Sequence, residues 1–255
     1  MARTIARLVR IDLNRDSDRA LVLFLSADLA LIFLNLLHEF TGSFADPNYS
    51  IQLERGFGET FQYLKEGWIT LILVILAVRA GNGLYTCWVA VFAFLLVDDL
   101  FAAHSRAGGI LGQALQLTPV LGLRARDMGE FIAIGVAVIV LAIPIAVEFV
   151  RGDARARSFW RSMGVLLVAL AAFGVLFDAI HITLLSNPSW EAVLGTIEDG
   201  GEMIVMSLIF RLVFREWHGS RKTLFLSRTK VDISMTDASA ALRSSGSRAG
   251  RLRGS

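Results

Sequence analysis

Long apolar runs separated by short polar segments dominate the hydropathy pattern of this chain. Six of them reach or approach the roughly 20 residues that an α-helix needs to cross a bilayer. These runs lie at Ala20–Phe40, Tyr63–Arg79, Leu84–His104, Glu130–Val150, Ser162–Leu185 and Ala192–Phe214. The pattern predicts an all-α, polytopic integral membrane protein whose residues 20–217 form a six-transmembrane-helix bundle.

Composition supports a membrane protein over a soluble one. Of the 255 residues, 55% are hydrophobic, and the mean hydropathy is +0.58. Both values exceed what the core of a soluble domain requires. The single cysteine, Cys87, excludes a disulfide within one chain. We expect the lipid bilayer as a partner and no nucleic acid, and we leave the oligomeric state open.

The basic residues predict the orientation, because cytoplasmic loops of membrane proteins are enriched in Lys and Arg. They gather before the first run, between the fourth and fifth runs, and after Arg211. The opposite side keeps only Arg55, Lys65, Arg106, Arg124 and Arg126. We therefore expect a multi-pass protein of the cell membrane with both termini in the cytoplasm.

The two ends of the chain read differently from the apolar runs. Residues 1–19 alternate basic and apolar positions, which is typical of a segment lying on anionic lipids of the cytoplasmic face; a solvated tail is the alternative. A cleavable signal peptide ending near Ser43-Phe44-Ala45 is a further alternative. Residues 218–255 are basic and rich in Ser, Ala, Gly and Arg, so we expect a disordered cytoplasmic tail.

Polar residues recur at one end of successive runs. Three outward runs end in an acid or amide followed by histidine, and three inward runs begin with glycine and an acid. The outward motifs are Asn35–His38, Asp98–His104 and Phe177–His181, and the inward ones start at Lys65, Met128 and Glu198. This recurrence indicates a bundle of three helical hairpins; independent placement of polar residues near an interface is the alternative.

The segment Phe177–Met203 carries the strongest sign of function. It places Asp178, His181, Glu198, Asp199 and Glu202 within two apolar runs. Each ionisable group costs roughly 2.5–3.5 kcal/mol to insert, so the set needs mutual pairing, water or a metal. Asp178 and His181 are three residues apart, and Glu198 and Glu202 four apart, so each pair shares one helix face.

Imidazoles and carboxylates from different helices form a ligand set for zinc, iron or manganese. We expect Asp178, His181, Glu198 and Glu202 to hold such a divalent metal, joined by His104 or His38. Asp199 is the candidate catalytic acid or base. His104 is not expected to stack over Asp98 or Asp99, since it lies beyond both on the same run.

Three classes of function fit these residues. A metal-dependent membrane enzyme acting on a lipid-like or quinone-like substrate uses a site in the outer half of the bilayer most directly. A proton or metal-cation transporter or channel needs a polar route past the inner half, where the sequence offers mainly Asp28 and the Pro144 kink. In a non-catalytic subunit or sensor, the polar groups only specify helix packing.

Overall fold

The computed structural model describes residues 11–80, 83–119, 123–152, 154–177 and 192–220. The chain divides into two compact units, Met1–Phe214 and Arg215–Ser255. All helices discussed below belong to the first unit. Two of the predicted metal ligands, Asp178 and His181, lie outside the described residues.

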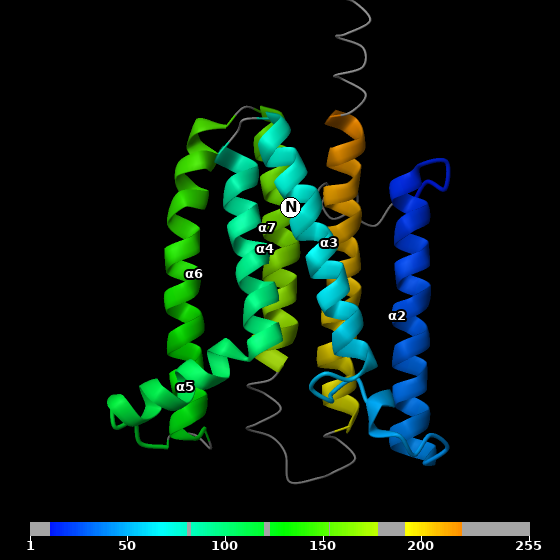
Figure 1. The fold of residues 1–255 in the computed structure, drawn as a ribbon, viewed down its shortest axis with the longest axis vertical. Helices are drawn as coiled ribbons and strands as arrows, with labels where there is room; N and C mark the ends of the chain where they lie inside the picture. Colours follow the sequence, from blue (N-terminus) through cyan, green and yellow to red (C-terminus); the bar gives the residue numbers. More distant parts are fainter. Residues whose placement is uncertain (1–10, 81–82, 120–122, 153, 178–191, 221–255) are drawn as a thin grey trace, which may run out of the picture. The chain divides into compact units, whose positions relative to one another are not determined.

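The described part of the first unit is helical and contains no β-strand. Five helical segments are long and apolar enough to cross a membrane, and Figure 1 shows them side by side. They are α2 (Asp16–Thr41), α3 (Phe57–Ala80), α4 (Gly83–Phe101), α6 (Ala125–Arg151) and Ala156–Gly174, which joins α7 (Ala154–Ala171) to the π-helical η2 (Ala172–Phe177).

A further helix spans residues 192–220 and is drawn in yellow to orange in Figure 1. We call its part in the first unit, residues 192–214, the C-terminal helix. It is not one of the five, and it carries Glu198, Asp199, Glu202 and Arg211. The predicted all-helical, membrane-type fold is thus confirmed, with five of the six predicted runs forming long apolar helices.

Two helix boundaries differ from the prediction. The third run ends at Phe101 rather than His104, because Ala102 adopts a left-handed conformation with φ of 45°. His104 therefore belongs to the short helix α5 (Ala103–Ala114), which Figure 1 shows lying across the end of α6. The second run starts earlier than predicted, at Phe57, so Lys65 lies two turns inside α3.

Aromatic rings fill the interior at two places. Phe24 of α2 meets Phe210 of the C-terminal helix with ring centroids 4.5 Å apart, and Trp68 of α3 packs on both rings. Trp88 of α4 and Trp160 of α7 form a second contact at 4.9 Å. These contacts bind α2 and α3 to the C-terminal helix, and α4 to α7.

Helix α6 faces outward. It packs against α4 and α5, yet none of the residues in its apolar 18-residue window is buried. Where α5 crosses α6, Gly108 and Gly129 bring the two backbones into direct contact. Small residues permit this close approach of helices in membranes.

Candidate functional site

Three polar contacts join α2 to the C-terminal helix at intervals along their length. Residue numbers rise along α2 as they fall along the C-terminal helix, so the two helices run antiparallel. The contacts are Asn35 Nδ2 to Thr196 Oγ1 at 2.8 Å, Ser207 Oγ to Asp28 Oδ2 at 2.5 Å, and Arg211 Nε to Asp18 Oδ1 at 2.6 Å. We call them the polar ladder. The step from Asp18 to Asn35 covers about 25 Å of helix, most of the roughly 30 Å hydrocarbon core.

The middle rung of the ladder contains a buried ion pair. Lys65 of α3 places its Nζ 2.9 Å from Asp28 Oδ1, and both side chains have zero solvent exposure. The same Nζ donates to the carbonyl oxygen of Met203 at 2.9 Å, and it lies 4.9 Å from the centroid of the Phe61 ring. The charge of Lys65 is thereby balanced by one carboxylate, one carbonyl dipole and one aromatic face.

A pair of carboxyl groups lies next to this ion pair. Glu66, which follows Lys65 on α3, is only 1% exposed, and its carboxyl lies next to that of Asp99 on α4. The Oε2 of Glu66 is buried and has no hydrogen-bond partner among the described residues. The negative charge of Glu202 also acts on Glu66, so Glu66 stands between Lys65, Asp99 and Glu202.

An acidic cavity of about 160 Å³ opens beside the carboxyl pair. Its walls come from residues 51–54, the start of α3, the end of α4 and the C-terminal helix, and none of the described residues that line it is Lys, Arg or His. Five of its lining residues are acidic: Glu54, Glu59, Asp99, Asp199 and Glu202. Gln62 also lines it, is 8% exposed, and leaves its Oε1 without a hydrogen-bond partner among the described residues.

Glu202 is held against η2. A Cβ added at Gly174 would collide with Glu202 Oε1, and one added at Gly201 would collide with the ring of Phe173. The glycines at these two positions therefore allow the C-terminal helix to approach η2 closely. Gly174 belongs to the face on which the sequence also places Asp178 and His181, and both of those residues lie outside the described part.

The structure brings together only part of the predicted metal site. Asp199 and Glu202 line the acidic cavity, and Glu198 is half-buried on the same helix. His38 instead uses Nδ1 to donate to the Phe44 carbonyl at 2.5 Å. Among the described residues, no group of three His, Cys, Asp or Glu side chains is arranged to hold a metal ion.

His104 also has another partner: it was not expected to stack over Asp98 or Asp99, and yet it contacts Asp98. Its Nδ1 lies 2.9 Å from Asp98 Oδ2, and its backbone N–H donates to Asp98 Oδ1 at 2.7 Å. The break at Ala102 turns the chain back, so that Asp98 reaches the start of α5. The hydrogen bond to Asp98 raises the pKa of His104 above its ordinary 6.5, although burial acts in the opposite direction.

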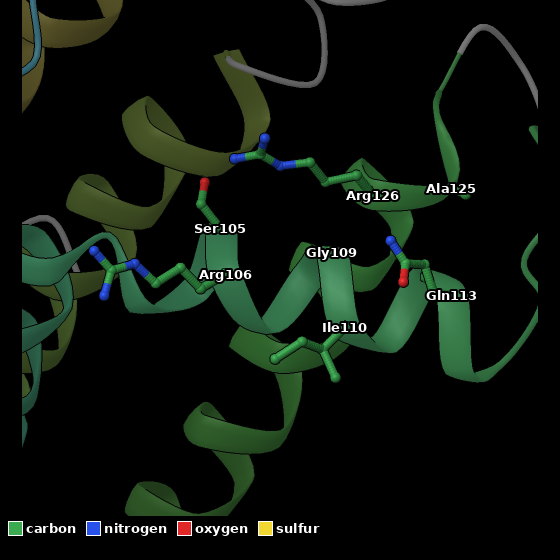
Figure 2. A pocket seen from close by; sticks show the side chains of 8 residues that line it. Ser105, Arg106, Gly109, Ile110, Gln113, Ala125 and Arg126 are labelled. Atoms are coloured by element: carbon green, nitrogen blue, oxygen red, sulfur yellow. The ribbon is translucent and has the colours of Figure 1, made fainter.

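A second hollow differs from the acidic cavity in size and charge. It lies between α5 and α6, measures about 690 Å³, and is shown in Figure 2. The described residues that line it include two arginines and no acidic residue: Ser105, Arg106, Gly109, Ile110, Gly112, Gln113, Ala125 and Arg126. We call it the α5–α6 groove.

Sequence reasoning missed the centre of the site, which is Lys65 with Asp28 and Glu66. Lys65 lies only two residues inside the second predicted run, which starts at Tyr63, so it reads as a charge of the outer segment. The available signal was Asp28, an acid far from either end of its run that needs a partner. Only tertiary packing identifies that partner as a lysine 37 residues away.

Five long apolar helices around a buried ionised core are the features of a helical membrane protein. Residues 19–215 match the family described as "Domain of unknown function (DUF8692)", and the chain belongs to that family. No curated protein and no solved structure matches the chain.

Proposed function

We propose that this protein is a transporter of the cell membrane that moves protons, alone or in exchange for a cation, along the polar ladder. The observation that carries the proposal is the buried Lys65–Asp28–Ser207 rung, which lies next to the Glu66–Asp99 carboxyl pair and the acidic cavity. Ionisable groups inside membrane segments commonly form proton relays, since their burial is otherwise costly.

The proposed route begins in the acidic cavity. Glu202 and Asp99 line it, so a proton from water in the cavity passes first to one of these carboxylates. Glu66 receives it from the neighbouring carboxyl of Asp99. Lys65 precedes Glu66 on α3 and bonds to Asp28, so a proton gained by Asp28 loosens the ion pair, and its loss restores the pair. Each step moves one proton between groups and changes no other bond.

The route beyond Asp28 favours a gated transporter over an open channel. Arg211 stays charged at all relevant pH values, so at the third rung only Asp18 is able to take up a proton. Asp28 and Asp18 are ten residues apart on α2, which corresponds to about 15 Å. A proton crosses this gap only if water enters or a helix moves. Either requirement makes proton movement gated rather than continuous.

The proposed topology gives the transport a direction. Six membrane-spanning helices, arranged as three hairpins with both termini in the cytoplasm, put the acidic cavity on the outer side. Protons then enter from outside through the cavity and leave past Asp18 and Arg211. The charge distribution of the sequence supports this orientation.

Proton flux into proteoliposomes tests the proposal. The full chain is reconstituted with a pH-sensitive dye inside, and acid pulses are applied with and without an opposing gradient of sodium, potassium or manganese. We expect faster acidification than in empty vesicles. Glu66→Gln, which keeps the shape but removes the proton-carrying group, should reduce the rate at least about tenfold, as expected for a lost relay group.

Glu39→Gln is the matched control. Glu39 is an exposed glutamate near the C-terminal end of α2, where it accepts a hydrogen bond from Ser50. It should leave the flux unchanged. Wild-type vesicles that acidify no faster than empty ones under every gradient would refute the proposal, as would Glu66→Gln vesicles that match wild type.

A metal-dependent membrane enzyme is the second candidate. The observation in its favour is that Asp199 and Glu202 face one cavity together with Asp99, which offers several carboxylate oxygens to a hard cation. Elemental analysis of the purified protein should then find near-stoichiometric zinc, iron or manganese. Glu202→Gln should lose that metal while remaining folded, and metal-free wild type would exclude this candidate.

A further inference from the structure

The α5–α6 groove combines a cationic rim with a small, apolar floor. Figure 2 shows Arg126 extending from the first turn of α6 toward Ser105, while Arg106 projects from the next position of α5. Gly109, Gly112 and Ala125 contribute little side-chain volume, which leaves the hollow of about 690 Å³. This volume is within the usual range of roughly 300–1,000 Å³ for small-molecule sites.

The positive charge at the rim is only partly compensated. Arg126 donates through Nε to Glu130 Oε1 at 2.9 Å, and Ser105 Oγ donates to the same oxygen at 2.9 Å. This bond leaves the two terminal amino groups of Arg126 for another acceptor. Arg106 is exposed and forms no ion pair with any residue that the structure describes. Planar guanidinium groups bind phosphate oxygens in pairs, with good geometry.

The surroundings of the groove indicate that its ligand comes from the bilayer. It opens beside α6, whose outward face is apolar and exposed, as at Val136 (55%), Ile139 (63%) and Ile143 (61%). Ile110, which lines the groove, is itself 69% exposed. A phosphate bound at the start of α6 would thus have a continuous apolar surface beside it for attached acyl chains.

We propose that the α5–α6 groove is a binding site for an anionic phospholipid. The phosphate lies between Arg106 and Arg126, the rest of the headgroup contacts Gln113, and the acyl chains run along α6. Residues 1–19 would contact anionic lipids by general attraction, whereas this groove holds one lipid in a shaped site. The proposal is independent of proton transport, because the groove and the acidic cavity have no lining residue in common within the part of the chain that the structure describes.

Native mass spectrometry of the full chain tests this proposal. The protein is delipidated in mild detergent and offered equal amounts of dioleoylphosphatidylglycerol and dioleoylphosphatidylcholine. We expect one phosphatidylglycerol retained with a preference of about tenfold, since each basic group contributes measurably to anionic lipid binding. Arg106→Gln combined with Arg126→Gln should reduce the preference to within about twofold.

Arg79→Gln combined with Arg151→Gln is the matched control. Arg79 and Arg151 lie at the other ends of α3 and α6, and Arg151 faces Glu148 much as Arg126 faces Glu130. This control should keep the wild-type preference. Equal loss in both double variants would show a general charge effect and overturn the proposal.

A second variant tests the shape of the groove without changing its charge. A Cβ at Gly109 meets nothing within 4 Å, so Gly109→Leu fills the groove and spares the fold. Gly135 on α6 has the same freedom, which makes Gly135→Leu its control. Lipid retention should fall at least fivefold in Gly109→Leu and remain at the wild-type level in Gly135→Leu.

Three further results would overturn the assignment. The first is that Gly109→Leu retains phosphatidylglycerol as well as wild type does. The second is that inorganic phosphate at millimolar concentration displaces the lipid completely, which would mean that the acyl chains contribute nothing. The third is that wild type carries no lipid but forms a dimer that Gly109→Leu disrupts, which would make the groove an interface between copies of this chain.

Discussion

A lysine inside an apolar helix is tolerated only when its charge is balanced, and Lys65 meets this condition through three contacts. Asp28 supplies the opposite charge, the Met203 carbonyl accepts a second hydrogen bond, and Phe61 provides a ring face. Ser207 completes the hydrogen bonding of Asp28 from the other side. The four groups come from three different helices, so one rung of the ladder fixes α2, α3 and the C-terminal helix to each other.

A double-mutant cycle measures how strongly the buried charges of Lys65 and Asp28 depend on each other. Asp28→Leu leaves a buried lysine without its counter-charge, and Lys65→Met leaves a buried carboxylate, so each should cost about 3–5 kcal/mol. The double variant leaves neither charge unpaired. Its loss of unfolding free energy should be smaller than the sum of the singles by at least about 1 kcal/mol. Unfolding in mixed micelles gives the values, and additivity would contradict the pairing.

His104 gives a pH-dependent contribution to stability. Because its pKa is raised above 6.5 by Asp98, the folded state binds a proton more tightly than the unfolded state does. The contribution is fully present below pH 6.5 and is lost as the pH rises through the folded-state pKa. Wild type should therefore exceed His104→Gln in melting temperature by more at pH 6 than at pH 9. The same difference at both pH values would show that the imidazole–carboxylate pair does not titrate as described.

The residues of the site differ in how well the sequence around each of them predicts its role. Asp199 and Glu202 were identifiable because several acids occur close together in an apolar run. Glu66 and Lys65 were not identifiable in this way. Both lie near a predicted helix end, where a charged side chain is equally consistent with contact with water. The Asp98–His104 contact was missed for a local reason, because a left-handed alanine is not a signal that sequence provides.

At the scale of helices, the close crossing of α5 over α6 depends on glycine. A Cβ at Gly129 would overlap the carbonyl oxygen of Gly108 and approach the backbone nitrogen of Gly112 to 2.9 Å. These are backbone atoms, so no side-chain rearrangement relieves the overlap. Here α5 packs on the first turns of α6.

Alanine at Gly129 should therefore separate α5 from α6. We expect Gly129→Ala to lower the unfolding free energy by about 1–3 kcal/mol, the usual cost of overpacking. Gly135→Ala adds the same methyl group six residues along the same helix, where nothing lies within 4 Å. That control should be neutral or stabilising by up to about 1 kcal/mol, because alanine favours helix over glycine. Thermal unfolding of the two variants in detergent compares them, and equal stability would refute the close crossing.

Hydrophobic periodicity predicted the long helices well, since length and composition alone define a membrane span. It predicted their ends less well, because the apolar run starts at Tyr63, whereas α3 already begins at Phe57 with the mainly polar stretch Phe57–Gln62. Hydrophobic periodicity also does not predict the antiparallel pairing of α2 with the C-terminal helix. These helices are separated by more than 150 residues, and the three polar contacts that align them are spaced too widely to form a motif.

At the scale of the whole molecule, the two hollows differ in charge. The orientation of the protein in the membrane decides from which side protons and lipid reach them. The acidic cavity is lined by residues near the end of α4 and the start of α3, and the α5–α6 groove lies at the start of α6. In the proposed orientation, with both termini in the cytoplasm, both hollows would face the outer side of the membrane. Protons would then enter from the outer side, and the bound phospholipid would belong to the outer leaflet.

Cysteine labelling tests this orientation directly. Cys87→Ser removes the native thiol, and Ser43→Cys or Gly152→Cys then introduces one thiol beyond the end of α2 or of α6. A membrane-impermeant maleimide added to intact cells should label Ser43→Cys and should label Gly152→Cys only after the cells are opened. The physical reason is the excess of arginine around residue 152, which holds that loop on the cytoplasmic side. The reverse pattern would turn the acidic cavity toward the cytoplasm. Proton flux through Glu66 would then run outward from the cavity, and the anionic lipid would come from the inner leaflet.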